Sequence, residues 1–406
     1  MIRPRPRRAT LLVPAILLAA SLPMRFAAAP VVDGASSQPT PPADELTVDL
    51  FADGPRTHLL TTRVAASVPP VLEHRVSTDG GATWSPATPI TPSRGVIANP
   101  TRNNDPQIVA VGDRVTVLWV TEEAVEGAVG QVESALSLDG GRTWSRGGRV
   151  NDRGFTEGWG FMDVAPTAAG RLAAAWIGIR QNGTTQERGL QFATSDDGGR
   201  TWQPNGFIDR EICECCWNTV STGWGDSLLA LYRDIPRDMA LARSTDGGKT
   251  WDRTGTVGAF GWTIDGCPDV GGSVVRGAAP GELFAMVWTG HEVRHGLYVL
   301  RSTDHGTTWS EPVRVGHEAA KHADLAFHDG RLVVAYDARV NGAMYVGVAT
   351  SSDGGRTWAD DGVVSTPGRR ATHPRLAASS AGVTAAWTET DVERGEVRVK
   401  TRAVGR

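Results

Sequence analysis

The sequence predicts an all-β fold: a single β-propeller of four-stranded antiparallel blades. Two observations predict it. The 406-residue chain contains 48 glycines and 24 prolines, and no long helical apolar pattern follows its N-terminal segment, so short strands joined by tight turns are favoured. In addition, one eight-residue motif ending in tryptophan returns six times at intervals of about 49 to 60 residues, which is typical of propellers and related arrays.

The N-terminal segment predicts export. Residues 1–29 combine a basic start (MIRPRPRR), an apolar stretch (ATLLVPAILLAASLP) and small residues that end at Ala29, which is the pattern of a secretory signal peptide. The apolar stretch is too short, and too interrupted by proline, for a membrane-spanning helix. No cysteine follows it to carry a lipid. We therefore expect a secreted or periplasmic protein without a membrane anchor, exported by the Sec or the twin-arginine route.

The rest of the chain divides into a short linker and one domain. Residues 30–44 (PVVDGASSQPTPPAD) have the composition of a flexible linker, and residues 45–406 are expected to form the propeller. The net charge of −4 becomes more negative once the arginines of the signal peptide are removed. This acidity argues against nucleic acid or an anionic membrane surface as a partner.

The repeated motif has the chemistry of a hairpin turn. In the first copy, Asp79 can accept hydrogen bonds from the backbone N–H groups of the turn, the glycines supply positive φ, and Trp84 anchors the turn in its blade. The six copies are STDGGATW (77–84), SLDGGRTW (137–144), SDDGGRTW (195–202), STDGGKTW (244–251), STDHGTTW (302–309) and SSDGGRTW (351–358).

These copies are identified as Asp boxes, also called bacterial neuraminidase (BNR) repeats. Through them, nearly the whole chain after the signal peptide resembles the sialidase-like propeller superfamily. In that superfamily the box is structural, and it also occurs in proteins that cleave no sugar. The resemblance therefore implies the fold and leaves the reaction open.

The spacing favours seven blades, with six as the alternative. Residues 46–91 can supply one complete blade, residues 373–403 supply three strands without a box, and five complete units lie between them. We expect an N-terminal strand to close the ring. The segment expected as the innermost strand of each later unit carries a recurring polar position. These polar residues are Asp105, Asp163, Asn218, Asp269, Asp324 and Arg375.

Cysteine and histidine recur two residues before that polar position. The residues there are Asn103, Phe161, Cys216, Cys267, His322 and His373. Since the innermost strands of a propeller begin around one mouth of its channel, four neighbouring blades would bring two thiols and two imidazoles together. Zinc and copper prefer such ligands.

Other residues can complete this predicted metal centre. The segment REICECCWNT (210–219) also holds Cys213 and Cys215, either of which could add a thiolate. Asp269 and Asp324 could accept hydrogen bonds from the imidazoles and orient them. A small-molecule, peptide or glycan ligand is the expected partner at the mouth.

Disulfides are the main alternative for the cysteines. Exported proteins use cysteine in this way, and a bridge such as Cys216–Cys267 would join neighbouring blades. Residues adjacent in sequence, such as Cys215 and Cys216, make strained partners for each other. One bridge combined with a smaller metal site lies between the two interpretations. A protein with bridges alone would be an interaction scaffold.

The segments CECC (213–216), GCP (266–268) and YRD (232–234) resemble an uncharacterised exported subgroup of sialidase-like propellers that shares all three. The resemblance implies that the cysteine cluster is a functional site and names no reaction. Arg233 in this group is expected either in a surface charge network or in contact with substrate.

An exo-α-sialidase or related glycoside hydrolase is the alternative enzyme. The sialidase resemblance implies three arginines that bind the substrate carboxylate and a tyrosine nucleophile. Arg375 faces the predicted channel, but no arginine motif of the family precedes the first box. The four tyrosines also fall at positions remote from the mouth: Tyr232, Tyr298, Tyr336 and Tyr345.

Overall fold

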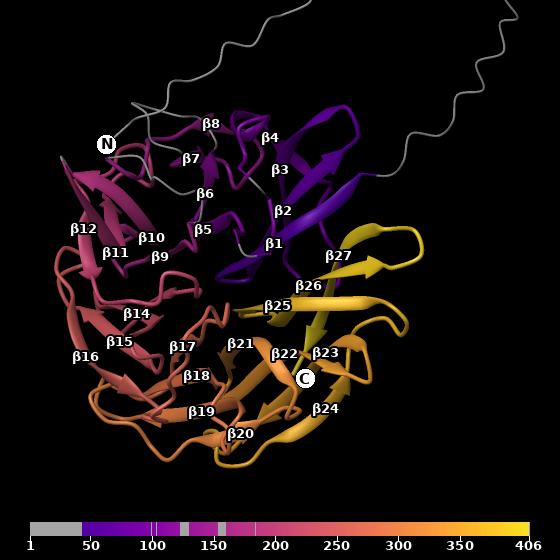
Figure 1. Cartoon of the computed structure of the whole chain (residues 1–406). Helices are drawn as coiled ribbons and strands as arrows, with labels where there is room; N and C mark the ends of the chain where they lie inside the picture. Colours follow the sequence, from indigo (N-terminus) through magenta and orange to yellow (C-terminus); the bar gives the residue numbers. More distant parts are fainter. Residues whose placement is uncertain are drawn as a thin grey trace, which may run out of the picture. The chain divides into compact units, whose positions relative to one another are not determined.

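Seven small antiparallel sheets lie in a ring in the computed structural model (Figure 1). The structure describes residues 43–98, 100–102, 104–121, 130–152, 160–182 and 184–405. Over these residues, six sheets have four strands and the last has three. The predicted all-β propeller and its seven blades are confirmed. The expected signal peptide and nearly all of the expected linker lie outside the described residues.

Each blade starts at the centre of the ring and is built from strands consecutive in sequence. Blade 1 consists of β1 (Asp44–Asp53), β2 (Arg56–Ala65), β3 (Val68–Ser77) and β4 (Thr88–Ile90), followed by the 3-10 helix η1 (Thr91–Ser93). Blade 2 consists of β5 (Gln107–Val111), β6 (Arg114–Thr121), β7 (Gln131–Ser137) and β8 (Ser145–Arg146). Blade 3 consists of β9 (Asp163–Pro166), β10 (Leu172–Asn182), β11 (Thr185–Ser195) and β12 (Gly206–Asp209). Blade 4 consists of β13 (Thr219–Thr222), β14 (Leu228–Arg233), β15 (Met239–Ser244) and β16 (Asp252–Val257), and blade 5 of β17 (Ser273–Arg276), β18 (Leu283–Thr289), β19 (Gly296–Ser302) and β20 (Val313–Val315). Blade 6 consists of β21 (Ala320–His328), β22 (Arg331–Val340), β23 (Ala343–Ser351) and β24 (Ala359–Val363). Blade 7 consists of β25 (Arg370–Ser379), β26 (Gly382–Asp391) and β27 (Glu396–Val404).

The core lies between the faces of neighbouring blades. The second strands β6, β14 and β18 are nearly continuous buried runs, because both of their faces pack against a neighbouring blade. Six blades bury a large aromatic residue in the second strand. These residues are Trp119, Trp176, Tyr232, Trp288, Tyr336 and Trp387.

The Asp boxes form the turns that the sequence predicts. In the first box, Asp79 accepts hydrogen bonds from the backbone N–H (2.9 Å) and the hydroxyl (2.6 Å) of Thr83, and Ser77 accepts one from the N–H of Gly81. Gly80 and Gly81 have φ values of 71° and 83°, which favour glycine. These hydrogen bonds lower the pKa of Asp79 to about 2.

The ring closes differently from the expectation. Blade 7 has the strand order β25-β26-β27, and among the described residues no further strand pairs with β27. The N-terminal strand β1 is instead the innermost strand of blade 1, since its whole length pairs with β2. The carboxylates of Asp44 and Glu45 accept hydrogen bonds from the backbone N–H groups of Val397 (2.8 Å) and Val399 (3.1 Å). The predicted closure by an added strand was therefore wrong, because side chains join blade 1 to blade 7.

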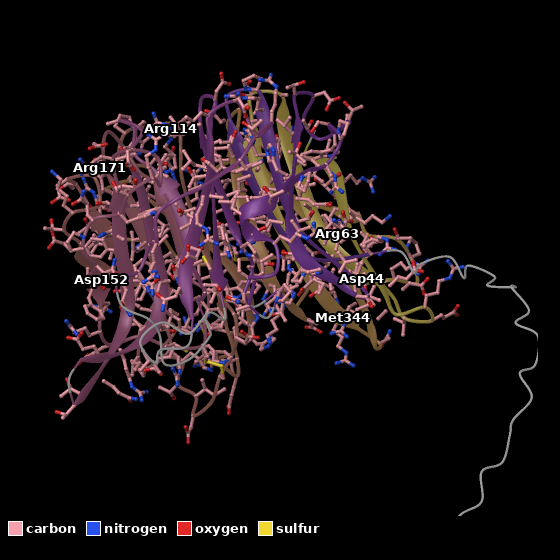
Figure 2. The ribbon with its side chains drawn as sticks, turned by 90° about the horizontal axis from the view of Figure 1, so that it is seen from above. Asp44, Arg63, Arg114, Asp152, Arg171 and Met344 are labelled. Atoms are coloured by element: carbon pink, nitrogen blue, oxygen red, sulfur yellow. A yellow bond between two sulfur atoms is a disulfide. The ribbon has the colours of Figure 1, made fainter. Side chains whose placement is uncertain are left out.

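The two faces of the ring carry different turns. Arg114 and Arg171 begin or precede second strands and mark the face where the Asp boxes lie, while Asp44 and Met344 lie toward the other face (Figure 2). The side chain of Arg114 packs against Gly198 in the third box. Of the residues described, no helix has the length and apolar character needed to cross a membrane.

Candidate functional site

A polar cavity lies along the axis of the ring. Its volume is about 240 Å³, and every innermost strand contributes to its wall. Every blade contributes a polar wall residue, and blade 4 contributes three: Asp49, Gln107, Asp163, Thr219, Ser221, Thr222, Ser273, Asp324 and Arg375. Of the recurring polar position, Asp163, Asp324 and Arg375 line the cavity, whereas Asp105, Asn218 and Asp269 are not among its wall residues.

The charges of this cavity are concentrated around Arg375. Burial raises the pKa of Asp49 and Asp105 to about 6 and that of Asp163 to about 7, and the charge of Arg375 opposes each shift. Burial alone would lower the pKa of Arg375, but the surrounding carboxylates raise it. Arg375 therefore stays charged and balances the acidic residues below the mouth.

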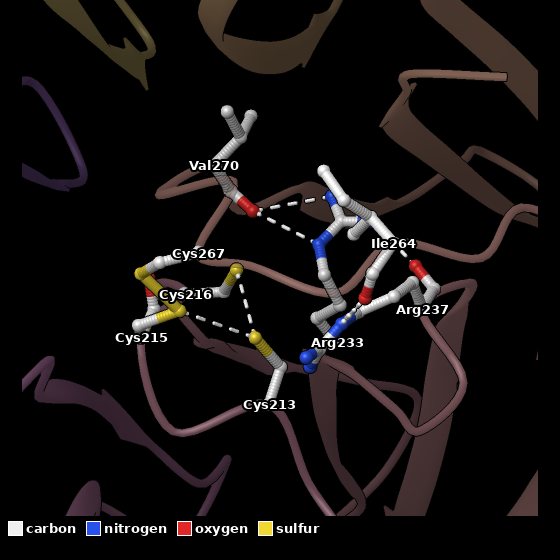
Figure 3. Close-up of a disulfide and its surroundings, with 8 residues drawn as sticks. All are labelled: Cys213, Cys215, Cys216, Arg233, Arg237, Ile264, Cys267 and Val270. Carbon is white, nitrogen blue, oxygen red and sulfur yellow. Dashed lines mark hydrogen bonds between the residues drawn. A yellow bond between two sulfur atoms is a disulfide. The ribbon is translucent and has the colours of Figure 1, made fainter. Parts of the chain in front are cut away.

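Four sulfur atoms gather at the mouth beside blade 4 (Figure 3). Three come from the loop between β12 and β13, and Cys267 comes from the loop between β16 and β17. Cys215 and Cys267 are joined in a disulfide, whereas Cys213 and Cys216 are free thiols. The Sγ atom of Cys213 lies 3.3 Å from that of Cys216 and 3.5 Å from that of Cys215. The arrangement is the mixed one, a single bridge beside a smaller set of free thiols.

The buried side chain of Arg233 lies next to this cluster. Its side chain is 1% exposed, and its guanidinium donates to the backbone carbonyls of Val270 (3.1 and 3.2 Å), Trp288 (3.1 Å) and Arg237 (2.6 Å). Figure 3 shows the guanidinium on the same side of the loop as the free thiols. Arg233 therefore joins two loops to strand β18 and places a positive charge next to the cluster. Because it is buried, Arg233 does not belong to a surface charge network.

The two free thiols differ in acidity. The contact with the thiol of Cys216 is the main cause that lowers the pKa of Cys213, helped by the charges of Arg237 and Arg233. Burial and, after it, the contact with Cys213 raise the pKa of Cys216. The surroundings therefore favour the thiolate form at Cys213 over Cys216.

Two histidines form a second cluster on blades 6 and 7. The imidazole rings of His322 and His373 are stacked with centroids 3.8 Å apart. Both lie where the innermost strand bulges: the register of β21 shifts between Ala320 and Ala323, and that of β25 shifts between Thr372 and Arg375. A bulge re-aims a side chain, and two bulges at equivalent places turn both rings toward each other.

One carboxylate fixes both imidazoles. The Nδ1 atom of His322 lies 2.9 Å from a carboxylate oxygen of Asp337. The hydroxyl of Thr372 donates to the same carboxylate at 2.7 Å and lies 2.6 Å from Nδ1 of His373. Since that hydroxyl proton is already donated, Nδ1 of His373 must be the donor to Thr372. Both rings therefore carry their proton on Nδ1 and a lone pair on Nε2.

The two Nε2 atoms are buried and make no hydrogen bond within the described part of the chain. Burial, followed by the charges of His322, Arg102 and Arg375, holds the pKa of His373 well below its usual range. Burial alone would raise the pKa of Asp337, but hydrogen bonds from His322, His373 and Thr372 lower it. The cluster thus consists of the carboxylate of Asp337, the imidazole of His322 and the neutral imidazole of His373.

Trp217 connects the two clusters. It follows Cys216 in the chain, and its ring centroid lies 5.6 Å from that of His322 and 4.9 Å from that of His373. The guanidinium of Arg375 lies 5.5 Å from the ring centroid. The residue that follows Cys216 in the chain therefore contacts both imidazoles.

The predicted site residues consequently fall into two groups. Over the described residues, the sets of three ligand atoms within 4.8 Å of one another are Cys213, Cys215 and Cys216 in one group, and His322, Asp337 and His373 in the other. Neither set mixes thiols with imidazoles. Asn103, predicted at the equivalent place in blade 2, lies outside the described residues.

The residue that orients the imidazoles is Asp337, which the sequence reasoning missed. Asp324 instead accepts hydrogen bonds from Ser273 (2.7 Å) and from the backbone of Leu376 (2.9 Å). Asp269 lies on the loop before β17, with φ of 54°. A signal for Asp337 existed: it directly follows the buried aromatic residue of its blade, where most other blades have an apolar residue or threonine.

The tyrosines lie where a sialidase nucleophile is not expected. Tyr232 donates to Asp209 at 2.6 Å, and Tyr336 and Tyr298 are buried in the apolar core. Tyr345 lies on β23 beside a surface cavity formed with residues such as His317. None of the four lines the axial cavity.

Comparisons with known proteins agree with the fold. Residues 71–260 match the model of the BNR repeat-like domain. An ulvan lyase from a new polysaccharide lyase family, bound to -[GlcA(1-4)Rha3S]-, is 11% identical, with a TM-score of 0.57 and coverage of 90% of this chain and 94% of that chain. The Hadza microbial sialidase Hz136 is 15% identical, with a TM-score of 0.50 and coverage of 86% and 77%.

A protein of unknown function from Dyadobacter fermentans is 17% identical, with a TM-score of 0.48 and coverage of 76% of this chain and 94% of that chain. A search of curated proteins gave no match.

Proposed function

We propose that this β-propeller, in which residues 71–260 match the BNR repeat-like domain, binds a zinc or copper ion through His322 and His373. The ion would be held at the mouth by the two Nε2 atoms. Asp337 would orient the ligands without binding the ion itself, as carboxylates that hydrogen-bond to metal-binding histidines commonly do.

The observation that supports this proposal is the pair of unused lone pairs. Asp337 and Thr372 take up both Nδ1 protons, so both Nε2 atoms are acceptors, and both are buried without a partner among the described residues. A buried acceptor without a partner is costly, and a cation bound at these two atoms would satisfy both. Neutral imidazole is a preferred ligand of zinc and of copper.

The thiols stand outside the proposed ligand set. Cys215 and Cys267 are joined to each other, and the thiols of Cys213 and Cys216 contact one another instead of an imidazole. Two protein ligands would leave coordination positions for water or for a ligand from solution, and an open position is what a metal site needs in order to act on a bound molecule. We propose that this ligand is a small molecule, peptide or glycan.

The proposed setting is outside the cytoplasm. The basic and apolar segment at the N-terminus predicts export, and a disulfide persists in an oxidising compartment. Copper and zinc are both accessible to an exported protein.

Metal content after equilibrium dialysis tests the proposal. The purified full-length protein is stripped with a chelator, dialysed against zinc chloride or copper sulfate, and measured by mass spectrometry of the elements. We expect one equivalent in the wild type and at least about a tenfold weaker affinity in His322→Gln and His373→Gln. We expect about 10–100-fold weaker affinity in Asp337→Asn.

His328→Gln is the matched control. His328 lies on the same strand β21, and its Nε2 faces Asp329 (3.4 Å) instead of the second imidazole. This variant should bind metal like the wild type, and circular dichroism should show that all variants are folded. Unchanged metal binding in both His322→Gln and His373→Gln would contradict the proposal, as would loss of the metal only in Cys213→Ser or Cys216→Ser.

A second candidate function is acid–base catalysis on a carbohydrate. It is favoured by the contact between His322 and Asp337, since a carboxylate that holds Nδ1–H leaves Nε2 free to take a proton. The fold neighbours named above include an ulvan lyase and a sialidase. In the presence of a chelator, ulvan and a fluorogenic sialoside serve as probes. Product that disappears in His322→Gln would support this function, and no product from either probe would exclude it for these substrates.

A further inference from the structure

The sulfur cluster has a geometry that the proposed metal site does not use. The thiol of Cys213 touches two partners at once: Cys215, which belongs to the disulfide, at 3.5 Å, and the free thiol of Cys216 at 3.3 Å (Figure 3). Cys213 and Cys216 are 2% and 1% exposed, while Cys267 is exposed. A buried dithiol is thus in contact with the inner sulfur of an exposed disulfide.

We propose that the four cysteines form a thiol–disulfide relay, which moves a disulfide between the exposed pair Cys215–Cys267 and the buried pair Cys213–Cys216. Thiol–disulfide exchange proceeds by attack of a thiolate on a disulfide sulfur, so the attacking atom must lie next to its target. The sulfur atom of Cys213 already lies there.

The first step forms a bond between Cys213 and Cys215. The thiolate of Cys213 attacks the Sγ atom of Cys215, the Cys215–Cys267 bond breaks, and Cys267 leaves as a thiolate that takes up a proton. In the second step Cys216, which gives up its proton, attacks Cys213 and releases Cys215. One disulfide and two thiols are present before and after, so the isomerisation needs no external oxidant or reductant.

Two features of the cluster favour this exchange. The two buried cysteines are separated by two residues, the spacing of redox-active Cys-x-x-Cys pairs, and their sulfur atoms are already in contact. The guanidinium of Arg233 lies beside both thiols, and its positive charge favours the anionic sulfur that each step requires.

The relay would give the protein a substrate class of its own. After exchange, the dithiol Cys215/Cys267 lies at the surface, where it can reduce a disulfide in another molecule. Two electrons and two protons would pass to that disulfide, giving two thiols, and the bond between Cys215 and Cys267 would form again. The protein would finish with two disulfides, and its substrate would finish reduced.

Alkylation of the native protein tests the first step. The full-length protein is incubated with N-ethylmaleimide without reductant, and tryptic peptides are mapped over time by mass spectrometry. In the wild type, alkylated Cys267 should accumulate together with a disulfide between Cys213 and either Cys215 or Cys216. In Cys213→Ser, alkylation of Cys267 should be at least about tenfold slower, because the attacking sulfur is absent.

Cys216→Ser is the matched control, since it removes the other buried thiol but keeps the attacking one. This variant should still expose Cys267 and should accumulate only the Cys213–Cys215 bond. Equal alkylation of Cys267 in the wild type and Cys213→Ser would overturn the relay, and so would a wild type whose Cys267 is never alkylated.

Oxidised glutathione then serves as the disulfide probe for the second role. The wild type should release two equivalents of glutathione and acquire two disulfides, whereas Cys213→Ser should fail to do so. If the isomers form but no glutathione is released, the reductase role is wrong for this class of disulfide. Circular dichroism checks the fold of each variant.

Discussion

Blades 4 and 6 place a buried charge at the same structural position and use it differently. Arg233 on β14 directly follows the buried Tyr232, and Asp337 on β22 directly follows the buried Tyr336. Both side chains point toward the start of an innermost strand, and both are almost fully buried, at 1% and 2% exposure. At this position most other described blades have an apolar residue or threonine.

The difference lies in what each charge contacts. Arg233 donates its hydrogen bonds to backbone carbonyls of two loops and of strand β18, so its main effect is to hold the segments around the sulfur cluster in place. Asp337 accepts hydrogen bonds from two side chains and two backbone N–H groups, and through them it sets the protons of both imidazoles. One position in the repeat therefore supports sulfur chemistry in one blade and a pair of nitrogen lone pairs in another.

Removing the carboxylate of Asp337 should have the largest effect on stability. Asp337→Ala leaves Nδ1 of His322, the hydroxyl of Thr372 and two backbone N–H groups without their acceptor. We expect the free energy of unfolding in urea to fall by about 3–5 kcal/mol, as for other broken buried charge networks. A loss below about 1 kcal/mol would show that water replaces the carboxylate and that the network is weak.

Removing the guanidinium of Arg233 should have a slightly smaller effect on stability and a separate effect on the thiols. Arg233→Met keeps much of the side-chain volume but leaves the carbonyls of Val270 and Trp288 without donors, which should cost about 2–4 kcal/mol. Alkylation of Cys213 by iodoacetamide near neutral pH should slow, because the nearby positive charge is lost. Metal binding through His322 should remain. Loss of metal in this variant would mean that the two clusters are coupled through Trp217.

The stability of the protein should depend on pH through His373 at the mouth and through a second pair of histidines in the core of blade 1. In blade 1, Nδ1 of His58 lies 2.9 Å from Nε2 of His74. Burial lowers the pKa of His58 to about 3 and that of His74 to about 4. The pKa of His373 is lowered as well. Because the folded protein binds fewer protons than the unfolded chain, each residue's contribution is complete above pH 6.5 and is lost as the pH falls toward the folded value. The slope is about 1.4 kcal/mol per pH unit for each residue.

Zinc should sharpen this contrast. Protons compete with a metal for the Nε2 atoms at the mouth. In experiments above pH 6.5, added zinc should therefore raise the urea concentration at the midpoint of unfolding, and this increase should become smaller at lower pH. His373→Gln should abolish the zinc effect and leave the slope due to His58 and His74. A zinc effect that persists in His373→Gln would place the metal elsewhere.

The sequence predicts the fold well because the fold repeats. The six copies of the turn motif form the same turn, since each aspartate accepts the same hydrogen bonds. The spacing of the copies predicts the length of one blade. The closure of the ring does not repeat. Whether the first strand joins blade 7 or starts blade 1 depends on long-range pairing, and the sequence alone does not decide between the two partners of the strand from Asp44 to Asp53.

The site is predicted only in part. Equivalent positions correctly place His322 and His373 together and Cys216 near Cys267. Strict alternation fails to predict the bulges, however, and these bulges turn the imidazoles toward each other and toward Asp337. The sequence also does not predict that Cys215 is the disulfide partner of Cys267. Cys213, Cys215 and Cys216 are so close in sequence that only the geometry of their loop decides which of them reaches Cys267.

The anomalous scattering of zinc in a crystal of the full-length protein, recorded on both sides of the metal absorption edge, tests the paired imidazoles most directly. A peak adjacent to the Nε2 atoms of both His322 and His373 is the expected result. A peak on the sulfur atoms of Cys213 and Cys216, or density without any anomalous peak near the stacked rings at saturating zinc, would contradict it.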